Sequence, residues 1–354
     1  MRAKSIMSVM ELKQIQASAG AIFDDTGVVL SFGHDDQALA AMDRGVAIGD
    51  RSGWGLLKIT GADRLRYLHN QSTNDFEKLK PGQGCDTVFV TSTARTLDLA
   101  TAYVTEDAVL VLVSPHRRQQ LLAWLDRFIF PFDKVELTDI SENTAIFSLI
   151  GEQSTNLLAN LTSETISLTE AADNQLVTIA GVAVRIAQGS GLVTPGYTLI
   201  VECQAAGMVW SKLNAEGAIP FGDRLWENLR IQQGRPTPDR ELTEEYNPLE
   251  AGLWQTISFD KGCYIGQETI ARLNTYKGVK QKLWGIKLNQ PVDPQTPITL
   301  EDSKIGILTS YTDTPTGSFG LGYIRTKAGG EGLQVKVGEA RGELVSVPFL
   351  CHKQ

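Results

Sequence analysis

Residues 54–76, "WGLLKITGADRLRYLHNQSTNDF", change from a strand pattern to a helix pattern at a glycine. The clustered apolar residues of "WGLLKIT" predict a buried strand. In the stretch that follows, Leu65 and Leu68 have helical spacing, and Thr60 is a candidate cap for a helix. A strand followed at once by a short helix is the first half of a compact α/β motif.

The segments after residue 76 complete this motif. The stretches "CDTVFVT" (85–91) and "LATAYVTEDAVLVLVS" (99–114) predict strands, the second folding as a hairpin about Glu106-Asp107. Ser114-Pro115 predicts a helix start, because serine caps helices and proline suits their first position. "DKVELTDI" (133–140) is the closing strand. The order β-α-β-β-α-β is that of a ferredoxin-like unit.

A second unit of the same kind is expected between residues 145 and 216, with a hairpin that turns at Gly181. "RLWENLRIQQG" then predicts a helix that ends at Gly234. Residues 235–253 are irregular and rich in proline and acidic side chains, which is typical of a long loop. From Lys282 onward, short strands separated by Gly, Pro and Asp predict a small β-barrel or sandwich.

Composition restricts the class of protein. The chain has 354 residues, which suits two or three domains, and 42% hydrophobic and 21% charged residues are typical of a globular protein. It lacks an apolar run of the ~20 residues that a membrane span needs. A formal net charge of -8 argues against broad nucleic-acid binding. The N-terminal residues do not resemble a secretory signal, so we expect a cytoplasmic location.

The cysteines and histidines show no metal-ligand spacing, and the sequence predicts no metal site. Cys85, Cys203, Cys263 and Cys351 are far apart and are expected to be free thiols. An iron–sulfur cluster needs several closely placed cysteine ligands. Any such cluster is therefore expected in a partner protein.

"KGCYIGQETIARL" (261–273) is a glycine-bracketed turn that opens a helix. A thiol near a helix N-terminus favours the thiolate, and Lys261 would add to this effect, so Cys263 is a candidate reactive cysteine. The same pattern also suits a small buried residue in a tight turn, where cysteine is common.

Two further candidates are charged. Arg230 lies one helical turn after Trp226, an arrangement that suits a carboxylate or a flat ring, although a solvated arginine fits equally well. Asp98, at a strand start, suits a general base or an amine-binding carboxylate, but an ordinary strand-end aspartate is the simpler interpretation. Glu250 and Glu268 are weaker candidates of the same kind.

Four stretches together resemble the YgfZ folate-binding family, which shares a superfamily with the T-protein, the aminomethyltransferase of the glycine cleavage system. They are residues 59–84, "LRIQQGRP" (229–236), residues 249–273 and the terminal "VSVPF". The most specific is "KGCYIGQE", which fits the K-G-C-Y-x-G-Q-E signature at every fixed position.

The resemblance implies an α+β, T-protein-like ring of three domains: two ferredoxin-like mixed α/β domains and a C-terminal β-barrel. Its expected divisions are a discontinuous folate-binding domain (1–49 and 144–240), a second ferredoxin-like domain (50–143), a motif loop and helix (241–281) and the barrel (282–354).

The resemblance also implies a function, which is support for assembly or repair of iron–sulfur clusters in client enzymes, with tetrahydrofolate or a derivative as cofactor. Its implied partners are the folate and iron–sulfur client or assembly proteins, and Cys263 is its motif cysteine. The residues it assigns to the folate site are Tyr197, Trp226, Arg230, Lys261, Gly262, Tyr264, Gly266, Gln267 and Glu268.

An aminomethyltransferase is the main alternative, and a scaffold without a ligand is the second. T-proteins typically carry two adjacent aspartates where this chain has Asp98 followed by Leu99. Thr194 stands where their folate-contacting glutamate would fall, and their residue at the position of Cys263 is usually not cysteine. These departures favour a folate-binding protein that is not a classical aminomethyltransferase.

Overall fold

The computed structural model describes residues 2–352, and contacts within the chain divide it into two compact units. Unit 1 comprises Met1–Arg64, Leu79–Cys85 and Thr101–Trp226. Unit 2 comprises Leu65–Lys78, Asp86–Ala100 and Glu227–Gln354. The division into four segments predicted from the sequence, with boundaries near residues 50, 144, 241 and 282, stays a prediction.

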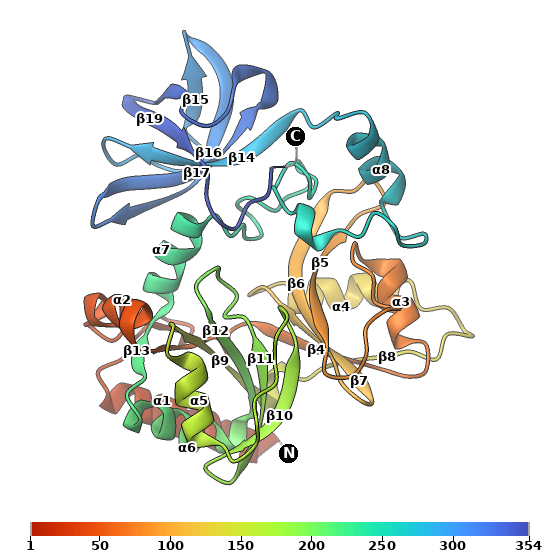
Figure 1. Cartoon of the computed structure of the whole chain (residues 1–354), viewed down its shortest axis with the longest axis vertical. Coiled ribbons are helices and arrows are strands. Elements are labelled where there is room, and N and C mark those ends of the chain that lie inside the picture. Colours follow the sequence, from red (N-terminus) through yellow and green to blue (C-terminus); the bar gives the residue numbers. More distant parts are fainter. Residues whose placement is uncertain (1, 353–354) are drawn as a thin grey trace. The chain divides into compact units, whose positions relative to one another are not determined.

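The helices and most of the strands are labelled in Figure 1. The helices are α1 (Arg2–Ser18), α2 (Asp35–Arg44), α3 (Arg64–Gln71), α4 (Arg118–Asp126), α5 (Ser154–Leu161), α6 (Cys203–Ala215), α7 (Asp223–Gln233) and α8 (Gln267–Thr275). Short 3₁₀ turns cover Ser141–Asn143, Trp254–Thr256 and Thr326–Ala328. Strands β1 (Ile22–Phe23) and β2 (Val29–Ser31) form a small antiparallel pair.

A six-stranded sheet with the order β10-β11-β12-β9-β3-β13 is the centre of unit 1. Its strands are β3 (Ala47–Asp50), β9 (Thr144–Ile150), β10 (Asn174–Ile179), β11 (Val182–Gln188), β12 (Gly196–Glu202) and β13 (Ile219–Phe221). All neighbours are antiparallel except β13 and β3. Every residue of β9 is buried, because this strand lies in the middle of the sheet.

Alternate residues of these strands form the apolar core on one face of the sheet, as the two-residue repeat of a strand requires. Phe147 of β9 and Leu199 of β12 are fully buried there, and Trp210 and Leu213 of α6 pack against them. Leu158 of α5 belongs to the same core. The sheet and these helices therefore form a two-layer α/β arrangement.

The second sheet has the order β5-β6-β7-β4-β8. Its strands are β4 (Gly55–Thr60), β5 (Gly84–Val90), β6 (Thr96–Val104), β7 (Ala108–Val113) and β8 (Glu136–Asp139). The hairpin between β6 and β7 turns at Glu106-Asp107, as predicted, and Thr105 N donates to Ala108 O at 2.8 Å across the turn.

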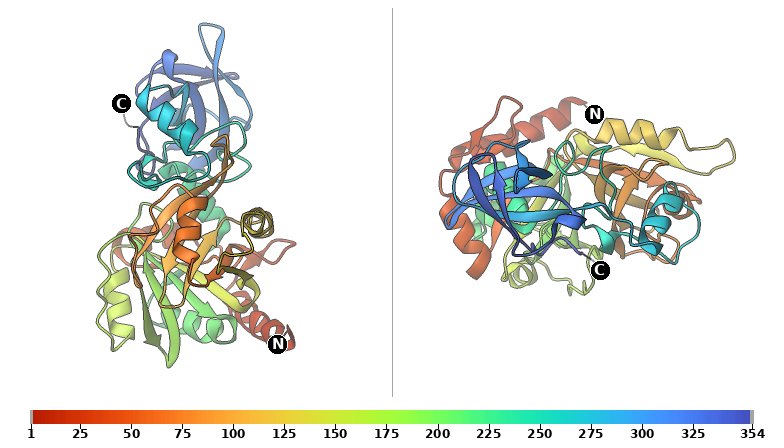
Figure 2. Two further views of the ribbon diagram at one scale, coloured as in Figure 1. Left: turned by 90° about the vertical axis from the view of Figure 1, so that its right-hand side faces the viewer. Right: turned by 90° about the horizontal axis from the view of Figure 1, so that it is seen from above.

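The C-terminal strands of unit 2 form a closed barrel with the order β14-β17-β16-β15-β18-β19 (Figures 1 and 2). They are β14 (Gln281–Leu288), β15 (Pro297–Leu300), β16 (Ser303–Thr314), β17 (Gly317–Arg325), β18 (Gln334–Val337) and β19 (Ala340–Val345). Pairing of β14 with β19 closes it, which removes every exposed sheet edge. The predicted α+β class with a C-terminal β-barrel is confirmed.

Two helix starts differ from the prediction. Thr60 does not cap α3, because it ends β4 and the helix begins at Arg64. Helix α4 begins at Arg118 rather than at Ser114-Pro115, because His116 has a left-handed backbone (φ 63°) that interrupts a helix.

The turn before α8 depends on Gly266, which has φ +83° and a position where an added Cβ would lie 2.8 Å from Thr91 O. Gly332 has nearly the same φ, +81°, with no atom near an added Cβ. We expect Gly332→Ala to lower the free energy of unfolding by about 1 kcal/mol, through backbone strain alone. Gly266→Ala should cost at least about 2 kcal/mol, because strain and contact add. Urea unfolding of both variants measures the difference, and equal losses would contradict a role for the contact with Thr91.

Candidate functional site

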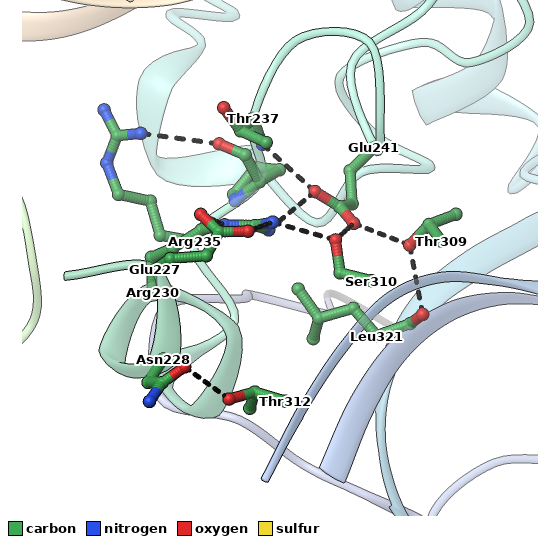
Figure 3. Close-up of polar contacts among 11 residues, drawn as sticks. Glu227, Asn228, Arg230, Arg235, Thr237, Glu241, Thr309, Ser310, Thr312 and Leu321 are labelled. Atoms are coloured by element: carbon green, nitrogen blue, oxygen red, sulfur yellow. Dashed lines mark hydrogen bonds and ion pairs between the residues drawn. The ribbon is translucent and has the colours of Figure 1, made fainter. Parts of the chain in front are cut away.

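Arg230 is buried inside unit 2, with 1% of its surface exposed. Each of its three nitrogens donates within the protein: Nε to Glu227 at 2.9 Å, Nη1 to Glu241 at 2.9 Å and Nη2 to Ser310 at 2.9 Å (Figure 3). Burial alone would lower the pKa of Arg230, but the charges of Glu241 and Glu227 outweigh it and raise the pKa. The guanidinium is therefore permanently charged and held in place from both sides.

Glu241 is fully buried and forms an ion pair with Arg230. Its Oε1 accepts hydrogen bonds from the hydroxyls of Thr309 and Ser310, each at 2.6 Å, and its Oε2 accepts one from Thr237 N at 3.2 Å. Neighbouring residues of a regular strand point to opposite faces. The pairing of β16 with β17 shifts register between Leu308 and Ser310, and this bulge lets both hydroxyls reach one carboxylate.

The motif segment (residues 261–268, "KGCYIGQE") is anchored by Lys261. Its ammonium is buried and donates to three backbone carbonyls: His69, Ser72 at 2.8 Å and Asn74 at 2.6 Å. His69 lies in the last turn of α3, and Ser72 and Asn74 follow its end, where helices leave acceptors without partners. Lys261 therefore ties the motif segment to the end of α3.

Cys263 is exposed, whereas Tyr264 beside it is buried and lies with its ring 4.7 Å from Lys261 Nζ. Burial raises the pKa of Tyr264 to about 12. Helix α8 begins only at Gln267, so Cys263 precedes its first turn by several residues. The helix dipole acts mainly within the first turn, and activation of this thiol by the dipole stays a prediction.

The other motif residues lie at the start of α8. Gly266 is the left-handed N-cap, Gln267 is the first helical residue, and Glu268 is exposed in the first turn, where a negative charge suits the helix dipole. Gly262 is also exposed.

His69 and Asp75 form a pair beside the motif segment that the sequence did not indicate. His69 Nδ1 lies 3.1 Å from Asp75 Oδ1, and both side chains are nearly buried. His69 Nε2 lies 3.6 Å from the place where a Cβ on Gly262 would stand. Burial, and then the charge of Lys261, lowers the pKa of His69, so the imidazole is neutral near pH 7.

The remaining candidates lie elsewhere. Asp98 is fully buried on β6 in unit 2. In unit 1, Trp226 lies 3.7 Å from the guanidinium of Arg51, measured to the ring centroid. Tyr197 is buried and shares a 2.9 Å hydrogen bond with Thr155. Unit 2 thus brings together Arg230 with Glu241, and Lys261 with the motif residues.

Among residues 2–352, no group of three or more His, Cys, Asp or Glu side chains has an arrangement that could hold a metal ion. No helix in this part of the chain is both long and apolar enough to cross a bilayer.

Removing Glu241 should leave Arg230 as an uncompensated buried charge. We expect Glu241→Ala to lower the free energy of unfolding by about 3–5 kcal/mol. Glu244 lies in the same loop but is exposed, so Glu244→Ala should change the free energy of unfolding by less than about 0.5 kcal/mol. Urea denaturation measures the free energy of unfolding of both variants. A single neutral hydrogen bond contributes roughly 1 kcal/mol. A loss below this value for Glu241→Ala would refute a structural role for the pair.

His69 should make folding sensitive to acid. Because its pKa is lowered in the folded protein, the unfolded chain binds the proton first as the pH falls, and stability decreases below about pH 6.5. The fall in unfolding free energy from about pH 7.5 to about pH 5.5 should be smaller in His69→Gln than in the unmodified protein. His116→Gln, at an exposed position, is the control and should leave the pH dependence unchanged.

The model of the GCVT N-terminal domain family matches residues 30–261. A relative from Arabidopsis thaliana, named "Putative transferase At1g60990, chloroplastic", is 46% identical over 97% of this chain and 80% of its own length. An aminomethyltransferase from Halalkalibacterium halodurans is 29% identical over 84% of this chain and 83% of its own length.

Among solved structures, the glycine cleavage system aminomethyltransferase T of Bartonella henselae superposes with a TM-score of 0.84 at 19% sequence identity. The match covers 97% of this chain and 98% of that one, and it confirms the predicted T-protein-like fold. With the family model covering most of the chain, these findings show that the protein belongs to the GCVT N-terminal domain family, within the T-protein superfamily.

Proposed function

We propose that this chain is a tetrahydrofolate-binding accessory protein of the YgfZ kind, which supports assembly or repair of iron–sulfur clusters in client enzymes through Cys263. The observation that carries the proposal is the exposed thiol of Cys263 in a segment where Lys261 and Tyr264 are buried.

The anchoring argues for a role of the thiol in contact with another molecule. Lys261 holds the segment through three carbonyls, Tyr264 is buried, and Gly266 sets the turn into α8. A cysteine kept only for packing would be buried as Tyr264 is. An exposed thiol can meet a macromolecular partner without unfolding of the segment.

The residues suit a folate in part. Asp98 is a buried carboxylate, the kind of acceptor that pairs with the amino and ring N–H groups of a pterin. The cationic groups of Arg230 and Lys261 are already bonded to several acceptors within unit 2. Their contact with folate stays a prediction, as do those of Tyr197, Trp226, Gly262, Tyr264, Gly266, Gln267 and Glu268. Bound tetrahydrofolate would supply one-carbon carrier chemistry.

An aminomethyltransferase is the second candidate, and the relatives of that name that cover most of this chain favour it. Against it, the residue after Asp98 is Leu99, which is buried and apolar. A second carboxylate next to Asp98, as the T-protein resemblance would require, is therefore missing. We propose a cytoplasmic location, while the Arabidopsis relative is named as chloroplastic.

Titration of the purified protein with tetrahydrofolate, followed by an aminomethyltransferase assay with the other glycine cleavage components, separates the two candidates. We expect binding without turnover. In cells that lack the protein, Cys263→Ser should fail to restore the activity of iron–sulfur enzymes, although its folate affinity should be unchanged, because the thiol is exposed and bonded to nothing in the segment.

Cys351→Ser is the matched control, since Cys351 is a free thiol of the same unit that lies outside the motif segment. Turnover of the aminomethyl substrate would favour the second candidate. Full restoration of cluster enzymes by Cys263→Ser would refute the role of this thiol.

A further inference from the structure

Unit 1 contains a cavity of about 460 Å³ that lies apart from every residue discussed above as a folate or thiol site. Its walls come from α1, from β2 and the turn before it, from the end of β3, from the start of β9 and from the start of α6. The apolar residues that line it are Leu12, Val28, Val29, Ala145 and Ala206. Cavities of a few hundred Å³ with mostly apolar walls are typical of small-molecule sites.

One acidic group of this wall, Asp50, is already satisfied. Asp50 Oδ1 accepts a hydrogen bond from Ser52 N at 2.9 Å, and Oδ2 accepts one from Gln16 Nε2 at 2.8 Å. Both carboxylate oxygens are thus engaged within the protein. Glu142, the other acidic residue of the lining, is exposed.

The basic groups of the lining have few partners within the described part of the protein. Lys13, which is half-buried, makes no hydrogen bond or ion pair with any side chain or carbonyl in the described part of the chain. Arg118 has a single ionic contact, from Nε to Asp139 at 3.6 Å, and its terminal nitrogens bond to no described residue. The hydroxyl of Ser52 accepts from Ile146 N, which leaves its hydrogen to donate.

Gly27 makes room for the lysine. An added Cβ at this position would lie 2.1 Å from Lys13 Nζ. The ammonium therefore rests in a gap at the cavity wall that only glycine leaves open. A half-buried cation without an acidic partner can pair with an incoming anion at the cavity wall.

We propose that this cavity binds a small amphiphilic carboxylate, with an apolar tail against Leu12, Val29 and Ala206 and a carboxylate head at Lys13 and Arg118. The unmet polar groups are donors only, so the head must be an acceptor. The cavity has one apolar region and one cationic end, so it suits a ligand with one apolar tail and one anionic head group. This site is independent of the proposed function of Cys263.

Calorimetric titration with octanoate, octanol and octylamine tests the head group. The three probes share one tail and carry an anionic, a neutral and a cationic head. Octanoate should bind with one site per chain, more tightly than octanol, and octylamine should not bind. Lys13→Gln and Arg118→Gln should each weaken octanoate about 10-fold, the usual effect of losing one charged hydrogen-bond partner. Lys287→Gln, an exposed lysine of the barrel, should leave the affinity unchanged.

Cys203 gives a second readout, because its thiol lines the cavity and burial raises its pKa to about 11. Octanoate should slow alkylation of Cys203 and leave that of the exposed Cys263 unaltered. Val28→Trp, which fills the rim, should abolish both binding and protection. The proposal fails if octanoate does not bind at millimolar concentration, if octylamine binds as well as octanoate, or if Lys13→Gln and Arg118→Gln bind like the unmodified protein.

Discussion

The buried ion pair between Arg230 and Glu241 is the interaction on which the organisation of unit 2 depends. It joins α7, the loop segment (residues 235–253) and β16 of the barrel through one guanidinium and one carboxylate. A buried charge is stable only when its partner and the remaining hydrogen bonds are all present. Each of these three elements must therefore be in place for the other two to be stable.

The same pair explains why a loop segment without helix or strand is ordered. Glu241 belongs to this segment, and its backbone carbonyl accepts a 2.8 Å hydrogen bond from Tyr323 Oη in the barrel. Tyr246, also of the segment, stacks on Tyr323 with ring centroids 3.5 Å apart. Side-chain contacts to the barrel thus replace the backbone ladder that a strand would have supplied.

Lys261 is also a buried charge, but neutral backbone carbonyls stabilise it in place of a carboxylate. Its ammonium uses the carbonyls left at the end of α3, so a cation and a helix terminus satisfy each other. The result is a fixed segment that exposes one thiol. In the cavity of unit 1, by contrast, the half-buried Lys13 has no acidic partner among the described residues. The cations in unit 2 hold structure, and the half-buried Lys13 in unit 1 is the basis of the proposed carboxylate site.

Local patterns were enough to predict the hairpins at Glu106-Asp107 and Gly181, the end of α7 at Gly234 and the short strands of the barrel. They depend on residues a few positions apart, and strand and helix periods are visible at that range. The motif residues around Cys263 were also recognisable, because a signature is a local string. The start of α4 was not, because the left-handed backbone of His116 has no local sequence signal.

The tertiary structure decided which charged side chains are buried and which groups they bind. Arg230 and Glu241 are 11 residues apart, and Ser310 lies 69 residues beyond Glu241, so nothing in the local sequence indicates their contact. The exposure of Cys263 and the burial of Lys261 likewise invert the usual preferences of thiol and ammonium groups. The sequence by itself determined most of the helices and strands after residue 54, since periodicity is local. Only the tertiary structure decided which charges are buried and which are left open, since a charge is stabilised by groups brought to it from distant parts of the chain.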